Sequence, residues 1–236
     1  MCGRFIISDT APDLAAMFDV EHEGENLPEP SWNIRPTEQI PIVVESQRTH
    51  PAVRRLESAR WSLIPSFATE RKSKFPTFNA RAETAAEKPT FKPSVRSQRA
   101  LIPATGYFEW RTENDVLTPY FMHSDDGLPL AFAGLYSWWK DPSVGETDPT
   151  RWVLSATILT TDAQGPLREI HDRTPVPLPE EWWDQWLDPA TEGDQMLVDA
   201  AVAASRVVIA SLNFYQVAPV TGNGPELIEP ITADSM

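Results

Sequence analysis

The only cysteine in the sequence, Cys2, stands directly after the initiator Met1. A small second residue generally permits removal of Met1, which would leave Cys2 with a free α-amine beside its thiol. An N-terminal α-amine has a pKa of about 7.7–8.0, so a useful fraction is neutral near neutral pH and can attack an aldehyde to form a Schiff base. The thiol can then close onto the imine carbon to give a five-membered thiazolidine. Cys2 is therefore a candidate nucleophile for carbonyl chemistry.

Three further polar residues are suited to moving protons or holding a nucleophile. Glu109 lies in an aromatic segment, and strand alternation places it on the face opposite its two neighbours, where partial burial would raise its pKa and make it a usable acid. His171 has an ordinary pKa of about 6.5, which suits proton exchange near neutral pH. Asn33 carries an amide that can fix geometry without charge. Their ordinary alternatives are a surface glutamate, a loop histidine bonded to Asp172, and a turn asparagine.

The composition excludes several other kinds of site. One cysteine cannot form an internal disulfide or a multi-thiolate metal site. The histidines, which show no ligand spacing such as H-E-x-x-H, are His22, His50, His123 and His171. We therefore expect no metal and no cofactor.

The charge of the chain is unevenly distributed. The net charge is −14, which argues against non-specific binding to duplex DNA. Residues 1–111, however, carry 15 Lys and Arg against 14 Asp and Glu, whereas residues 112–236 carry 5 against 20. Any nucleic-acid surface should therefore come mostly from the first half of the chain.

The elements that would position these residues are short and mostly extended. β-Branched and aromatic segments bounded by turn residues predict strands at 40–45, 99–104, 107–111, 119–123, 130–138, 152–160 and 206–212. Apolar spacing predicts helices at 11–19, 80–87, 180–187 and 194–204, with long loops at 21–38 and 62–79. The pattern predicts an α+β fold, a single strand-rich domain with a curved, barrel-like antiparallel sheet and flanking short helices. We expect this domain to span 1–228, with 229–236 as a tail.

Seven short motifs stand in a fixed order along nearly the whole chain. They are Met1–Phe5 (MCGRF), Trp32–Thr37 (WNIRPT), Trp61–Phe67 (WSLIPSF), Asn79–Thr84 (NARAET), Gly106–Trp110 (GYFEW), Ile170–Pro175 (IHDRTP) and Gly224–Ile228 (GPELI). Each motif alone is weak, but several in this order, beginning at residue 2, are specific. The sequence resembles the SRAP family, the SOS-response-associated peptidases that crosslink to abasic sites.

The resemblance implies a mechanism. The cysteine after Met1 links covalently to the ring-opened sugar of an abasic site in single-stranded DNA, which maps onto Cys2. The family's positioning asparagine maps onto Asn33, and its proton-handling residues map onto Glu109 and His171. Weak cleavage of the DNA strand at the abasic site and self-catalysed removal of Met1 are also implied.

The residues expected to contact DNA offer either a phosphate donor or a flat surface for a base. The expected phosphate contacts are Arg4, Asn79, Arg81, Thr160 and Arg173, and the expected wedges against flanking bases are Pro36 and Phe67.

Two other functions stay open on the sequence alone. Cys2 could serve a cysteine peptidase or N-terminal-nucleophile amidohydrolase, or it could be incidental in a non-enzymatic single-strand-binding module. The sequence has no apolar run of membrane-spanning length and no signal-peptide stretch at its start. We therefore expect a cytoplasmic protein that acts as a monomer on single-stranded DNA containing abasic sites, away from any membrane.

Overall fold

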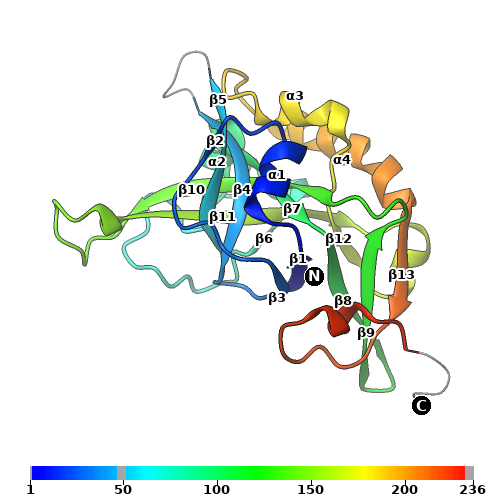
Figure 1. Ribbon diagram of the computed structural model, residues 1–236. Coiled ribbons are helices and arrows are strands. Elements are labelled where there is room, and N and C mark those ends of the chain that lie inside the picture. Colours follow the sequence, from blue (N-terminus) through cyan, green and yellow to red (C-terminus); the bar gives the residue numbers. More distant parts are fainter. Residues whose placement is uncertain (1, 47–51, 232–236) are drawn as a thin grey trace.

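Two β-sheets and a few short helices form the protein (Figure 1). The computed structural model describes residues 2–46 and 52–231. The strands are β1 Arg4–Ile7, β2 His22–Glu23, β3 Ser31–Ile34, β4 Gln39–Ser46, β5 Val53–Trp61, β6 Asn79–Arg81, β7 Arg99–Ala104, β8 Gly106–Glu113, β9 Val116–Ser124, β10 Leu130–Lys140, β11 Trp152–Asp162, β12 Arg173–Pro175 and β13 Leu212–Gln216. The α-helices are α1 Ala11–Met17, α2 Lys92–Ser97, α3 Trp183–Leu187 and α4 Gln195–Ala210. The 3-10 turns are η1 Ala82–Thr84, η2 Pro149–Arg151, η3 Gly165–Glu169, η4 Glu180–Trp182 and η5 Pro225–Ile228.

The larger sheet closes on itself. Its strand order is β12-β11-β10-β7-β4-β5-β2, and β5 also pairs in parallel with β11, which joins the ends of a ring formed by β11, β10, β7, β4 and β5. The smaller sheet has the order β13-β9-β8-β1-β3. The expected strand-rich α+β fold with a barrel-like sheet is confirmed. The sheet is not purely antiparallel, however, because β11 pairs in parallel with β5 and β6.

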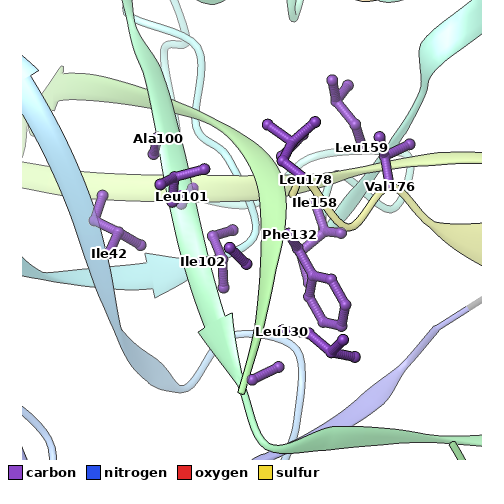
Figure 2. Close-up of a cluster of buried hydrophobic side chains, with 14 of the residues drawn as sticks. Ile42, Ala100, Leu101, Ile102, Leu130, Phe132, Ile158, Leu159, Val176 and Leu178 are labelled. Atoms are coloured by element: carbon purple, nitrogen blue, oxygen red, sulfur yellow. The ribbon is translucent and has the colours of Figure 1, made fainter. Parts of the chain in front are cut away.

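The core has two parts, and β8 lies between them. The main cluster includes Ile102, Phe132 and Ile158, all three of which are labelled in Figure 2. A smaller cluster on the other side of β8 contains Phe108. Successive side chains of a strand point to opposite faces, so Tyr107 enters the main cluster while Phe108 enters the smaller one.

The end of the chain differs from the sequence prediction. A strand was expected at 206–212, but α4 continues to Ala210 and the strand that follows is β13. The Asp194 side chain caps α4 by accepting from the Leu197 backbone N–H at 3.0 Å, and an inward-facing stripe ending in Ser205 and Ile209 runs along the helix. The β-branched residues of this segment therefore pack as helix, since burial outweighs their modest preference for strands.

Other predicted elements also changed. The prediction of a helix at 80–87 is wrong, because β6 pairs with β11 up to Arg81 and only the short turn η1 follows. The expected loop 21–38 contains β2 and β3, and α2 was not predicted. At the other end, the Ile231 backbone N–H donates to the Gln216 carbonyl at 3.1 Å, so the chain stays attached to β13 beyond the expected start of the tail. No helix in residues 2–46 or 52–231 is long and apolar enough to cross a membrane.

A buried arginine ties two helices to the barrel. Arg99 is 2% exposed. Its guanidinium donates to the carbonyls of Trp186 at 2.7 Å and Val95 at 3.0 Å, and further donors reach the carbonyls of Arg96, Asp188 and Thr191. These carbonyls lie at or just beyond the C-terminal ends of α2 and α3, where the helix dipole favours a cation. Arg99 therefore satisfies carbonyl groups that would otherwise be buried without partners.

We expect Arg99→Met to lower the free energy of unfolding by about 3–5 kcal/mol, because it leaves this set of carbonyls without their charged donor. Arg99→Lys should recover only part of the loss, since an ammonium lacks the planar fork that reaches several carbonyls. Urea denaturation measures both effects. The exposed Arg168→Met is the matched control and should change stability by no more than about 0.5 kcal/mol. Equal stability of Arg99→Met and the control would contradict this role.

Candidate active site

Cys2 is held between the start of β1 and the start of β6. It is fully buried, and its thiol lies 3.7 Å from the Arg4 carbonyl, to which it donates. Its own carbonyl accepts from Asn79 Nδ2 at 2.7 Å. The backbone on both sides of the thiol is therefore fixed by the sheet.

Strand β8 brings an acid to this nucleophile. It pairs antiparallel with β1, with Phe5 opposite Tyr107, and the next residue on the Tyr107 face is Glu109. Burial raises the pKa of the Cys2 thiol, and the nearby charge of Glu109 raises it further. The thiol therefore stays protonated and is not a resident thiolate.

Glu109 is itself removed from water. It is 4% exposed, and burial raises its pKa from an ordinary value of 4.5 to about 7. A carboxyl group with this pKa is part acid and part base near neutral pH, which is the range in which general acid–base catalysis works best. The sequence predicted a partly buried Glu109 on the strand face opposite to that of Phe108. The structure has Glu109 in this position.

The raised pKa of Glu109 predicts a pH-dependent cost to stability. The folded-state pKa exceeds the unfolded value, so the contribution of Glu109 to the free energy of unfolding is fully present below about pH 4.5 and is lost as pH rises through about 7. We expect Glu109→Gln to be more stable than the wild type by about 3 kcal/mol at pH 8, with the difference vanishing near pH 4.5. Urea denaturation across this range tests it. Glu113→Gln, on the exposed end of the same strand, should leave the pH dependence unchanged. If Glu109→Gln also left it unchanged, the buried-carboxyl interpretation would be wrong.

His171 follows η3 and faces two partners through one nitrogen. Its Nδ1 accepts from the Arg173 backbone N–H at 2.9 Å and also lies 2.8 Å from Asp172 Oδ1. The first contact requires a lone pair on Nδ1, whereas the second is favourable only when Nδ1 carries a proton. Burial lowers the pKa of His171, so we assign the neutral ring, with its proton on Nε2.

The segment that carries His171 is fastened to β8. The Tyr107 hydroxyl lies 3.0 Å from Thr174 Oγ1, and both side chains are buried. Burial raises the pKa of Tyr107, with smaller contributions from the charges of Cys2 and Glu109. This tyrosine was not singled out from the sequence, although its position two residues before Glu109 on the same strand face was a usable signal. It joins β8, which carries the acid, to β12, which begins two residues after the imidazole of His171.

The hydrogen bonds of Asn33 and Asn79 differ from those that the sequence suggested. Asn33 lies on β3, accepts from Arg4 Nη1 at 2.8 Å and donates to the Gly222 carbonyl at 2.6 Å. Its hydrogen bonds within the described residues thus join β3 to Arg4 and to the chain after β13. The direct contact with Cys2 belongs to Asn79, which was expected to bind phosphate.

The residues expected to contact DNA fall into surface and interior groups. Arg81 is exposed at the end of β6, and Phe67 is 61% exposed. Arg4 and Pro36 are partly exposed. Thr160 and Arg173 are buried, so neither side chain reaches the surface.

The guanidinium group of Arg173 is already bonded to acidic side chains. It forms two 2.9 Å bonds to Glu83 and a 2.5 Å bond to Asp162. It also donates to the Thr160 carbonyl at 2.6 Å. A phosphate contact by Arg173 would require these bonds to open, so the arrangement is better suited to fixing β12 against β11. Among residues 2–46 and 52–231, no three His, Cys, Asp or Glu side chains gather closely enough to hold a metal ion.

Comparison with known proteins supports the resemblance seen in the motifs. The profile of the SOS response associated peptidase (SRAP) family matches residues 1–223. The abasic site processing protein YoqW of Bacillus subtilis is 34% identical over 97% of this chain and 99% of its own length. YedK of Escherichia coli, which bears the same description, is 32% identical over 98% and 100%. A crystal structure of a Bacteroides thetaiotaomicron protein shares the fold, with a TM-score of 0.78 at 22% identity over 98% of this chain and 100% of that one. The chain therefore belongs to the SRAP family.

Proposed function

We propose that this protein binds single-stranded DNA and, after loss of Met1, joins Cys2 to the ring-opened sugar of an abasic site as a thiazolidine. The names of YoqW and YedK, abasic site processing proteins, support this substrate. The observation that carries the proposal is the burial of a lone Cys2 beside Glu109, an acid whose pKa of about 7 fits proton transfer. This pairing suits a thiol that adds to an imine.

The chemistry balances without an added reagent. The α-amine of Cys2 attacks the aldehyde carbon of the opened sugar, and loss of one water gives a Schiff base. Protonation of this imine makes its carbon electrophilic. The Cys2 sulfur then bonds to that carbon while the thiol proton is released and the nitrogen becomes the ring amine. In this proposal Glu109 protonates the imine, and the neutral imidazole of His171 removes the proton from the sugar hydroxyl during ring opening.

The surrounding residues take supporting roles in this proposal. Asn79 holds the Cys2 carbonyl, which aims the backbone of the nucleophile at the lesion. Arg81 and Arg4 supply positive charge for the phosphates, and Pro36 and Phe67 press against the flanking bases. Because a Schiff base at an abasic sugar also permits β-elimination, we expect slow strand cleavage as a side reaction.

A peptidase acting through Cys2 is the second candidate. Cysteine peptidases attack as thiolates, so they keep the pKa of the nucleophile low. Here burial raises the pKa of Cys2, which favours aminothiol chemistry on aldehydes over attack on amides. Removal of Met1 as a single self-directed cleavage remains compatible with the same residues.

The experiment that tests the proposal uses an oligonucleotide with one abasic site. We expect an adduct that survives denaturation, with the mass of the Met1-less protein plus the DNA minus one water. A matched oligonucleotide with a tetrahydrofuran at that position cannot open its ring and should bind without forming the adduct. Absence of an adduct with the abasic strand, or its formation with the tetrahydrofuran strand, would overturn the proposal.

A further inference from the structure

The segment 62–78, here called the 62–78 loop, begins and ends beside the candidate active site (Figure 1). At its base, Ser62 Oγ lies 2.8 Å from Thr77 Oγ1, and the Leu63 backbone N–H donates to the Thr77 carbonyl at 3.1 Å. The residue after the loop, Asn79, holds the carbonyl of Cys2. A strand of DNA leaving the nucleophile can therefore pass directly onto this loop.

The middle of the loop is fastened to the barrel. Trp139 Nε1 donates to the Ala68 carbonyl at 2.7 Å, and Arg71 forms a 3.0 Å ion pair with Asp141 while lying over the Trp139 ring. Burial and the neighbouring charge of Arg71 lower the pKa of Arg60, so two guanidinium groups lie close together here. The loop thus presents its outer side chains from a held backbone.

Those outer side chains combine aromatic rings with positive charge. Phe67 is 61% exposed and Phe75 is 77% exposed. The exposed cations of the loop are Arg71, Lys72 and Lys74, against a single glutamate. Exposed rings among cations are the usual features of a surface that stacks bases and neutralises phosphates of single strands. The contrast with a chain of net charge −14 makes this a locally basic surface.

We propose that Phe75, Lys72 and Lys74 of the 62–78 loop form a platform for single-stranded DNA separate from the contact proposed for Phe67. Phe75 stacks a base away from the lesion, and the two lysines bind the adjoining phosphates. Asn79 is the fourth residue after Phe75, so the backbone of Phe75 lies within about 14 Å of the residue that holds Cys2. The stacked base is therefore only a few nucleotides from the abasic site. This inference rests on the proposed function, because it extends the DNA path of the same site.

The test compares single strands of two lengths that carry a tetrahydrofuran in place of the abasic sugar. We expect Phe75→Ala to raise Kd for a strand with ten flanking nucleotides on each side by about 5- to 100-fold, the effect of losing one stacked base. A strand with one flanking nucleotide on each side should bind wild type and variant equally. Trp152→Ala, which removes another exposed aromatic side chain, is the matched control and should not change Kd.

The contribution of the two lysines can be measured separately, through the salt dependence of binding. In Lys72→Gln/Lys74→Gln, the slope of log binding constant against log salt should fall by about 1.4, because each single-strand phosphate contact contributes about 0.7.

The outcomes separate the two proposals. If wild type crosslinks but Phe75→Ala binds the long strand as tightly as wild type, the platform is refuted and the proposed function stands. A wild type that fails to crosslink while Phe75→Ala still weakens long-strand binding refutes the crosslinking function and leaves the platform in place.

Discussion

Replacing Cys2 with alanine should eliminate the stable adduct with abasic DNA. The alanine variant can still lose Met1 and form a Schiff base through its α-amine, but it has no thiol to close the ring. We therefore expect no denaturant-resistant product unless borohydride is added, which reduces and traps the imine. Cys2→Ser should behave in the same way. Denaturing gels with and without reductant measure the difference.

A second variant isolates the amine. A chain with an N-terminal extension that cannot be removed keeps the Cys2 thiol but places the nearest α-amine too far away to share a five-membered ring. It should bind tetrahydrofuran-containing DNA normally and give neither the stable nor the reducible adduct. A stable adduct with Cys2→Ala would refute the central role of the thiol, and full activity of the extended chain would show that the thiol acts alone.

Glu109→Gln and His171→Ala should each slow single-turnover crosslinking by about 10²–10⁴-fold, the usual contribution of general acid–base catalysis. The acid form of Glu109 is lost as pH rises through about 7, so the wild-type rate should fall in that range and Glu109→Gln should lack the fall. The neutral form of His171 accumulates as pH rises. Because burial lowers the pKa of His171 below its ordinary value, this change occurs on the acid side. His171→Ala should therefore lose the rise at low pH.

Matched controls are available on exposed parts of the same sheets. Glu113→Gln changes a glutamate at the exposed end of β8, and His22→Ala changes an exposed histidine on β2. Both should crosslink at the wild-type rate from pH 5 to 9. If Glu109→Gln and His171→Ala matched these controls, Glu109 and His171 would be structural and Cys2 alone would carry the reaction.

The sequence predicted the local features of the site better than its long-range contacts. Alternation along a single strand was enough to place Glu109 on the face of Tyr107. It could not show that β8 lies against β1, because that pairing joins residues about a hundred positions apart. For the same reason the motifs could not distinguish Asn33 from Asn79 as the partner of Cys2, since the deciding hydrogen bond exists only after β6 joins the barrel.

The burial of Arg173 was also beyond the sequence. Arg173 was expected to contact phosphate because a guanidinium offers a bidentate fork, but Glu83, ninety positions away in the sequence, pairs with it instead. The strand predicted at 206–212 shows a different limit. Its β-branched residues favour a strand locally, whereas the buried stripe that keeps them helical depends on the barrel packed against α4.

The short spacing between Cys2 and β1 limits how this protein can evolve. β1 begins at Arg4, so one inserted residue before it would carry the nucleophile about 3.3 Å along the sheet. One inserted residue within β8 would turn Glu109 to the opposite face. Related lineages can exchange surface side chains freely, but the number of residues in these two segments is fixed by geometry. Divergence there should consist of substitutions, with insertions and deletions confined to the loops between strands.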